Sequence, residues 1–157
     1  MLTLYKSLVR PSLDYCIQVW KPYMQKDVLL LEKVQKRFTK MVEGCKGIQY
    51  ESRMNKLGIT TIAERHTRAD MIQAYKIIND KRKIFSAHFH VFSGRKGRKN
   101  SIQLFKRRCN LELRRHSFTV RIVDQWNNLP DEVILSKDAE TFKCKFDYYR
   151  RNVRGHP

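Results

Sequence analysis

The sequence predicts an all-α protein: a small helical bundle followed by a basic loop and a short helical C-terminal unit. Three observations favour this class. Apolar residues recur at spacings of three and four, candidate helix caps precede them, and the 157 residues include only six glycines and four prolines. Apolar residues make up 41% of the chain and aromatic residues 11%, enough to build a hydrophobic core. We place the division near residue 80, between regions 1–80 and 81–157.

The first region opens with short helical stretches. Residues 1–9 have the pattern of a short helix that Arg10-Pro11 interrupts, and Trp20-Lys21-Pro22 marks another break. Asp27 is the expected N-cap of a longer helix that stops at Gly44. Its expected buried face consists of Leu30, Leu31, Val34, Phe38, Met41 and Val42.

Two more helices complete the first region. One is expected from about Tyr50 to Leu57, ended by Gly58. Thr61-Ile62-Ala63-Glu64 then has the form of a capping box, in which the Thr side chain bonds forward and the Glu side chain bonds back. The helix that it opens should end near Asn79. Its apolar side is expected to include Ile62, Ala69, Ile72, Tyr75 and Ile78.

The second region has a looser pattern. Residues 85–92 fit either a short helix or a strand, and residues 93–101 combine two glycines with four bases and no apolar residue, which predicts a loop. Helical spacing returns from Phe118 to Trp126 and ends at Asn128-Leu129-Pro130. A last helix is expected to begin near Asp138. Its inward side chains would be Phe142, Phe146 and Tyr149.

Basic residues are concentrated in one quarter of the chain. Residues 81–121 hold thirteen Lys or Arg and one acid, Glu112, so they carry +12 of the net charge of +18. So much like charge in one segment repels itself unless a polyanion neutralises it. Nucleic acid is the first candidate for that partner and an anionic membrane surface the second.

Short motifs follow one another in order along nearly the whole chain. They are Leu4-Tyr5-Lys6-Ser7-Leu8-Val9-Arg10-Pro11, Leu13, Tyr15-Cys16, Val19-Trp20, Pro22-Tyr23, Leu31-Glu32-Lys33-Val34-Gln35-Lys36-Arg37, Lys40-Met41, Leu57-Gly58-Ile59, Arg68-Ala69-Asp70-Met71-Ile72, Tyr75-Lys76-Ile77, Phe118, Arg121-Ile122-Val123, Trp126-Asn127, Leu129-Pro130 and Phe142-Lys143. This series resembles the region after the polymerase palm in non-LTR retrotransposon reverse transcriptases of the jockey and chicken-repeat types. The resemblance implies that residues 1–80 are a thumb-like bundle, which in such enzymes holds the template–product duplex behind the active site. It implies that residues 81–157 belong to the extension that follows.

The metal-binding carboxylates that such polymerases use for catalysis are absent from this sequence. Polymerases of that family hold two metal ions with an aromatic-x-Asp-Asp turn and a third carboxylate. Here the only neighbouring acids are Asp131-Glu132, which we expect in the first turn of a helix. No Ser, Thr or Cys has a recognisable base partner either. We therefore expect a non-enzymatic chain without cofactor, metal or small-molecule substrate, which looks like an excised or truncated tail of such an enzyme.

The candidate binding residues lie in the basic quarter. A flexible basic loop can follow phosphates without reading bases, so the first candidates are Arg95, Lys96, Arg98 and Lys99. The basic residues that extend the same patch are Lys106, Arg107, Arg108, Arg114 and Arg115. The same loop also fits a solvated segment or a nuclear-import signal.

Other residue types give weaker signals. His88 and His90 could form a metal pair on a strand, but no third ligand is near in sequence, and a partly buried or surface pair is favoured. His66 is expected on the surface. The four cysteines form no C-x-x-C motif and are expected as free thiols. Trp20, Trp126, Tyr148 and Tyr149 could stack on bases. We favour the core for Trp126 and Phe142, and expect one of the two adjacent tyrosines to be exposed.

The expected partner is RNA, an RNA–DNA hybrid or a DNA duplex. The apolar N-terminal residues Leu2, Leu4, Leu8 and Val9 also suggest self-association or docking onto a larger reverse transcriptase. The longest apolar run, 28–31, is too short to span a membrane, and Lys6 and Arg10 interrupt any secretory signal. We expect an intracellular protein, chiefly nuclear and also cytoplasmic. The alternatives are a helical protein-interaction module with a nuclear-import patch, or an orphan retroelement fragment without selected activity.

Overall fold

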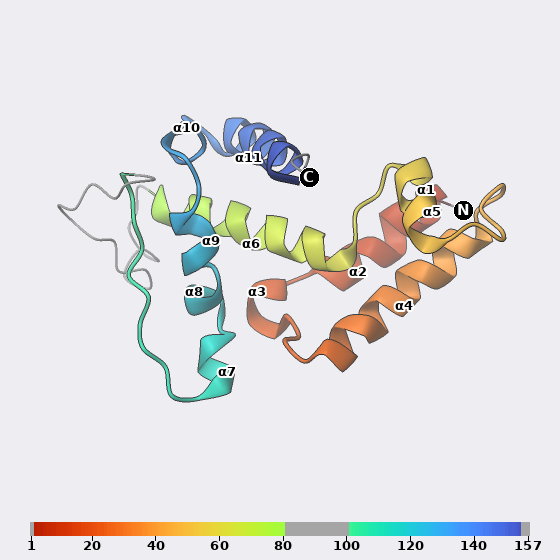
Figure 1. Cartoon of the computed structure of the whole chain (residues 1–157), viewed down its shortest axis with the longest axis horizontal. Coiled ribbons are helices and arrows are strands. Elements are labelled where there is room, and N and C mark those ends of the chain that lie inside the picture. The colour runs from red at the N-terminus through yellow and green to blue at the C-terminus, as the bar shows by residue number, and fades with distance from the viewer. Residues whose placement is uncertain (1, 81–100, 155–157) are drawn as a thin grey trace. The chain divides into compact units, whose positions relative to one another are not determined.

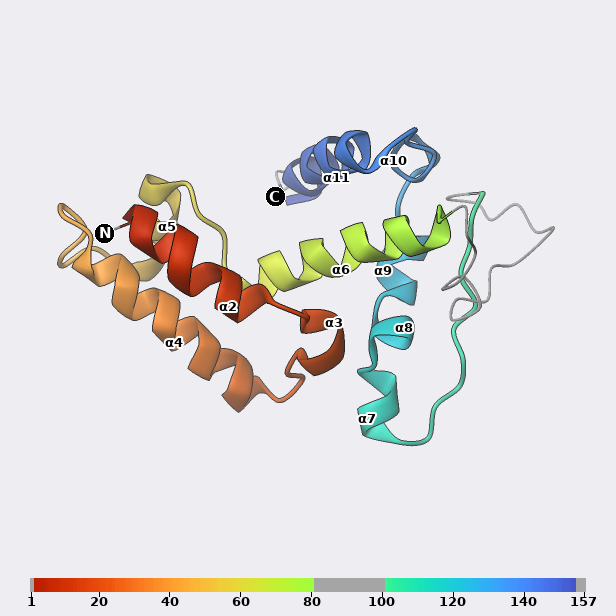
Figure 2. The same ribbon diagram turned by 180° about the vertical axis from the view of Figure 1, so that it is seen from behind.

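The computed structural model describes residues 2–80 and 101–154, which are drawn as ribbon from two opposite sides in Figure 1 and Figure 2. These residues form helices and contain no strand, so the predicted all-α class is confirmed. The contacts within the chain divide it into two compact units, Met1–Ala69 and Asp70–Pro157. The functional division at residue 80 stays a prediction. No helix within 2–80 or 101–154 is long and apolar enough to cross a membrane.

The first unit begins with helical turns that follow one another directly. They are α1 (Leu2–Leu4), the π-helical turn η1 (Tyr5–Val9) and α2 (Arg10–Asp14). The expected interruption at Arg10-Pro11 is therefore wrong. Pro11 lies in the first turn of α2, a helix position at which proline is common. The wider π turn before it leaves room for the proline ring. The break after Trp20 is confirmed, since α3 (Ile17–Trp20) ends there.

Helix α4 (Gln25–Met41) buries a different face from the expected one. Its buried side chains are the polar Glu32, Gln35 and Thr39, while Leu30 and Met41 are exposed. The remaining apolar residues of the predicted face, Leu31, Val34, Phe38 and Val42, are half-buried. The expected N-cap is also wrong, because Asp27 lies in the first turn and Met24 precedes the helix. The helix ends three residues before Gly44.

A hydrogen-bond network explains why α4 turns polar residues inward. Tyr5 Oη donates to Gln35 Oε1 at 2.7 Å, and Gln35 Nε2 donates to the carbonyl of Thr60 at 3.1 Å. Glu32 accepts from the Tyr50 hydroxyl and, at 3.0 Å, from the backbone N–H of Ile62. Buried polar groups with such partners avoid the cost of lost hydration. Burial raises the pKa of Tyr5 to about 12, against the lowering effect of nearby Arg10.

The predicted helix end at Gly58 and the predicted capping box at Thr61 are confirmed. Helix α5 (Tyr50–Leu57) ends at Gly58, whose φ of 58° is left-handed. The capping box before α6 (Ile62–Ile78) forms as predicted, with Thr61 N–H donating to Glu64 and Glu64 N–H donating to Thr61 Oγ1, both at 3.2 Å. The expected surface position of His66 is wrong. Its ring is buried against the carbonyl of Leu13.

The second unit packs the later part of α6 against short helices and one long one. These are α7 (Glu112–Arg115), α8 (Phe118–Arg121), α9 (Val123–Asn127), α10 (Asp131–Ile134) and α11 (Ala139–Arg154). The predicted core positions of Trp126 and Phe142 are confirmed, since both are fully buried. The rings of Tyr75 and Phe142 stack with centroids 4.4 Å apart, which joins α6 to α11.

Further details of the second unit match the sequence. Asp131 and Glu132 occupy the first turn of α10. Asp138 caps α11, because its Oδ1 accepts the N–H of Thr141 at 2.7 Å. Tyr148 is exposed and its neighbour Tyr149 is partly buried, as expected. The four cysteines, all within the described residues, are free thiols. The helix-or-strand alternative for 85–92, the histidine pair His88 and His90, and residues 93–100 of the basic loop lie outside the described residues.

Candidate nucleic-acid interface

An extended segment, residues 101–109, is held along α9 and α10 by side chains of those helices. Trp126 Nε1 donates to the carbonyl of Ile102 at 2.8 Å. Asn127 Oδ1 accepts the N–H of Leu104, and Asn127 Nδ2 donates to the carbonyl of Leu104, both at 2.9 Å. The Leu104 side chain is buried. The segment runs beside α7, α8 and α9 in both views (Figures 1 and 2). This anchoring fixes the start of the basic run that follows.

The basic run continues into the corner formed by α7 and α8. Arg115 on α7 donates from Nε to the carbonyl of Cys109 at 3.1 Å, which closes the corner onto the extended segment. Arg121 on α8 donates from Nη1 to the carbonyl of His116 at 3.0 Å. The same guanidinium is fixed from the other side by Asp70 of α6, at 3.0 and 2.8 Å. Buried charge pairs of this two-point geometry hold a guanidinium in one orientation.

The extended segment and the corner surround an open depression of about 560 Å³. Its rim and walls carry five basic side chains and two carboxylates. The lining residues are Lys106, Arg107, Arg108, Cys109, Glu112, Arg115, His116, Val120, Arg121 and Asp124. We call this feature the basic depression.

Both carboxylates of the basic depression are paired with basic side chains that also line it. Glu112 accepts from Arg115 Nη1 at 3.1 Å and lies 2.9 Å from His116 Nε2. Asp124 pairs with Lys106. These side chains are more than a third exposed, and exposed ion pairs contribute little free energy. A phosphate that enters the depression can therefore replace a carboxylate at small cost.

The structure brings together some of the predicted site residues. Lys106, Arg107, Arg108 and Arg115 line the basic depression, and Arg114 is exposed on α7 without lining it. The first candidates, Arg95, Lys96, Arg98 and Lys99, lie outside the described residues.

The sequence interpretation missed three polar residues of the basic depression. Arg121 lies at the end of the basic quarter, in Arg121-Ile122-Val123, but its partner Asp70 is 51 residues away. His116 lies four residues after its partner Glu112, a local spacing that the sequence interpretation overlooked, whereas Asp124 pairs with Lys106, 18 residues away. Charge counts identify the segment and cannot identify these pairings.

No group of three or more His, Cys, Asp or Glu side chains that could hold a metal ion occurs in the part of the chain that the structure describes. The lining of the basic depression offers cationic hydrogen-bond donors around an open surface. Comparisons with protein-family models, with curated protein sequences and with solved structures found no match to this chain.

Proposed function

We propose that this chain is a non-catalytic nucleic-acid-binding module that grips RNA or an RNA–DNA duplex through its phosphates. The observation that carries the proposal is the basic depression, where Lys106, Arg107, Arg108 and Arg115 meet beside Arg121, which Asp70 holds. Arginine binds phosphate through a planar fork of N–H donors, and Lys106 adds a point charge. Phosphate contacts of this kind hold a backbone without reading its sequence.

The net charge of the chain supports the same ligand. At +18 the chain attracts any polyanion at long range, and neutralising phosphates releases condensed counterions. The resemblance to the region after the palm of non-LTR retrotransposon reverse transcriptases points in the same direction, since a thumb holds template–product duplex. We propose that the module derives from such an RNA-directed DNA polymerase and acts in the nucleus.

The test is a binding titration at several salt concentrations. Purified protein is titrated against labelled RNA, DNA duplex and RNA–DNA hybrid of equal length, and the logarithm of affinity is plotted against the logarithm of salt. Replacing three arginines of the basic depression with glutamine (R107Q, R108Q and R115Q together) should lower the slope by roughly 2 to 3.

A charge-matched variant controls for the loss of net charge. It carries K33Q, K137Q and R151Q, which are exposed residues remote in sequence from the basic depression. This variant should keep a slope within about one unit of the parent. Equal losses in the two variants would show diffuse attraction and would remove the basic depression as a site. Binding of no nucleic acid at low salt would contradict the proposed function itself.

A second function is favoured by two exposed leucines. Leu111 and Leu113, each 73% exposed, flank Glu112 between the arginines of the basic run. Phosphate binding does not need them, whereas an acidic, apolar protein segment would use both leucine and arginine contacts. In that case the chain is a helical protein-interaction module with a nuclear-import patch. Binding would then depend on the leucines and only weakly on salt.

The N-terminal apolar residues bear on partners too. Leu4 and Leu8 are exposed, while Leu2 and Val9 are half-buried. We propose self-association or docking onto a larger reverse transcriptase through this face. Sedimentation of the parent and of a variant with L4S and L8S tests it, since only the parent should associate as concentration rises.

A further inference from the structure

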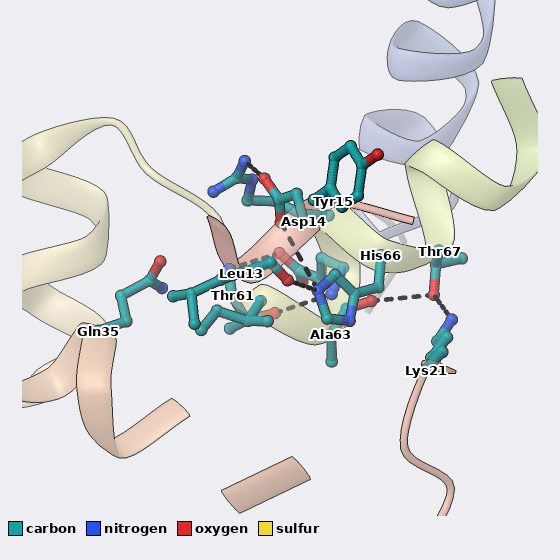
Figure 3. Close-up of polar contacts among 12 residues, drawn as sticks. Leu13, Asp14, Tyr15, Lys21, Gln35, Thr61, Ala63, His66 and Thr67 are labelled. Atoms are coloured by element: carbon teal, nitrogen blue, oxygen red, sulfur yellow. Dashed lines mark hydrogen bonds and ion pairs between the residues drawn. The ribbon is translucent and has the colours of Figure 1, made fainter. Parts of the chain in front are cut away.

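The corner between α2 and α3 is fastened to α6 by three consecutive residues of that helix. Arg65 pairs with Asp14, the buried His66 ring lies with Nε2 2.9 Å from the carbonyl of Leu13, and Lys21 Nζ donates to Thr67 Oγ1 at 3.5 Å. In Figure 3, Leu13 and Asp14 converge on His66, and Lys21 reaches Thr67 on the other side. These polar contacts attach both arms of the corner to one rigid helix.

The corner itself is sharply bent and internally fixed. Cys16 has a φ of 51°, a left-handed conformation that side chains other than glycine rarely adopt. Beyond the bend, Trp20 Nε1 donates back to the carbonyl of Tyr15, and the indole meets the His66 ring edge-on with centroids 5.8 Å apart. Backbone strain of this kind persists only where surrounding contacts enforce it.

This rigid corner displays large apolar side chains to solvent. Tyr15 is 75% exposed and Val19 87%, while Trp20 and Tyr23 are each about two-fifths exposed. In Figure 3 the Tyr15 ring points away from the polar cluster around His66. Tyr15 and Val19 contribute little to the core, because most of each side chain is exposed. Several large exposed apolar side chains close together in sequence on a rigid support favour a binding site.

The charges around the corner favour a polyanion over a neutral apolar partner. Between Asp14 and Asp27 the chain carries Lys21 and Lys26 and no acid. Asp14, the acid at the bend, is paired with Arg65. Aromatic rings beside basic side chains are the combination that binds single-stranded nucleic acid. The nucleobases stack on the rings, and the lysines contact the phosphates.

We propose that the α2–α3 corner is a base-stacking site for single-stranded nucleic acid, with Tyr15, Trp20 and Tyr23 as its stacking rings. The proposal rests on the proposed function, because both take nucleic acid as the ligand. It places the unpaired nucleobases on the first unit, whereas the basic depression that binds the phosphates lies in the second. A base on an aromatic ring contributes enough that losing one ring weakens binding about fivefold or more.

The experiment uses the full chain and a ten-nucleotide oligouridylate with no secondary structure. Tyr15→Ala and Tyr23→Ala should each weaken its binding about fivefold or more while leaving the salt slope unchanged, because neither removes a charge. Leu135→Ala is the control, since that apolar side chain is 60% exposed after α10 and should have no effect. Binding of a blunt RNA–DNA duplex should be the same in all three variants.

Fluorescence gives an independent readout. The chain has two tryptophans, of which Trp126 is fully buried and Trp20 is part-exposed. Oligouridylate should therefore quench the emission of Trp20, and Trp20→Phe should abolish the quenching. Circular dichroism of each variant verifies that the helices are intact.

The outcomes separate this proposal from the proposed function. Unchanged oligouridylate binding in Tyr15→Ala and Tyr23→Ala, with no quenching of Trp20, overturns the stacking site even if the duplex still binds. Binding of no nucleic acid by the parent overturns both proposals. If these substitutions abolish self-association and leave oligouridylate binding intact, the corner is a protein contact and the stacking site is overturned.

Discussion

Asp70 and Arg121, 51 residues apart, form a two-point ion pair that ties α6 to α8. Asp70 is 2% exposed and the Arg121 side chain 14%. The third donor, Nη1 of Arg121, is used by the carbonyl of His116, so one guanidinium fixes the corner between α7 and α8 as well. The pair therefore connects the core of the second unit to the wall of the basic depression.

Asp70→Asn should destabilise the second unit by about 3 to 5 kcal/mol, because it leaves the Arg121 charge buried without its counter-ion. Urea unfolding followed by circular dichroism measures the loss. Replacing both partners with apolar residues, as Asp70→Leu with Arg121→Met, should recover most of it, since no uncompensated charge then remains. An Asp70→Asn variant as stable as the parent would show that the pair contributes nothing.

The first unit should lose stability in alkaline solution. Burial raises the pKa of Tyr5 from 10.0 to about 12, so the folded chain holds the phenol proton more tightly than the unfolded chain. The resulting stabilisation is fully present below pH 10 and is lost as the pH rises from 10 to 12. Burial also raises the pKa of Tyr50, which adds to the effect in the same direction.

Unfolding by urea at several pH values between 8 and 11.5 tests this linkage. Tyr5→Phe should flatten the decline in stability above pH 10, although it also removes the donor to Gln35. Tyr148→Phe changes an exposed tyrosine and should leave the decline as in the parent. A Tyr5→Phe variant with the parent's full alkaline decline would show that Tyr5 is not its source.

Local patterns predicted the helix boundaries best. Gly58, the Thr61–Glu64 capping box and Asp138 are right because each signal and its partner lie within four residues. Such contacts need no distant partner, although the equally local signals at Asp27 and Arg10-Pro11 are wrong.

Distant partners account for the errors about which side chains are buried. The buried face of α4 was predicted from apolar residues, but Glu32 and Gln35 bond Ile62 and Tyr5, each 30 residues away. His66 is buried because Leu13, 53 residues earlier, offers it a carbonyl. In the candidate site, charge density identified Arg107, Arg108 and Arg115, and no pattern within the sequence could pair Arg121 with Asp70.

Gly58→Ala should cost about 1 kcal/mol of stability. At a φ of 58° an added Cβ crowds the backbone, even though the space around it is open. Gly58→Asn is the matched variant, because asparagine tolerates the left-handed conformation and should cost less. Thermal unfolding of the three proteins should rank their stability as parent, then Gly58→Asn, then Gly58→Ala. Equal stability of the parent and Gly58→Ala would contradict this prediction.

Glu112→Gln should strengthen the binding of nucleic acid. The Glu112 carboxylate occupies the basic depression as an internal anion, held by Arg115 at 3.1 Å and lying 2.9 Å from His116. A phosphate that uses Arg115 must first displace it, and it also meets its negative charge. Because exposed pairs are weak, the gain should be about two- to fivefold in affinity, with a slightly steeper dependence on salt.

Glu140→Gln is the matched control for that change. Glu140 is an exposed carboxylate paired with Lys143 on α11, so the substitution raises the net charge equally and leaves the basic depression untouched. Titration of both variants against the same RNA–DNA hybrid at 0.1 M salt separates a local effect from a general one. If the two variants bind equally, Glu112 does not compete with phosphate; if only Glu112→Gln gains, the carboxylate and the phosphate share one site.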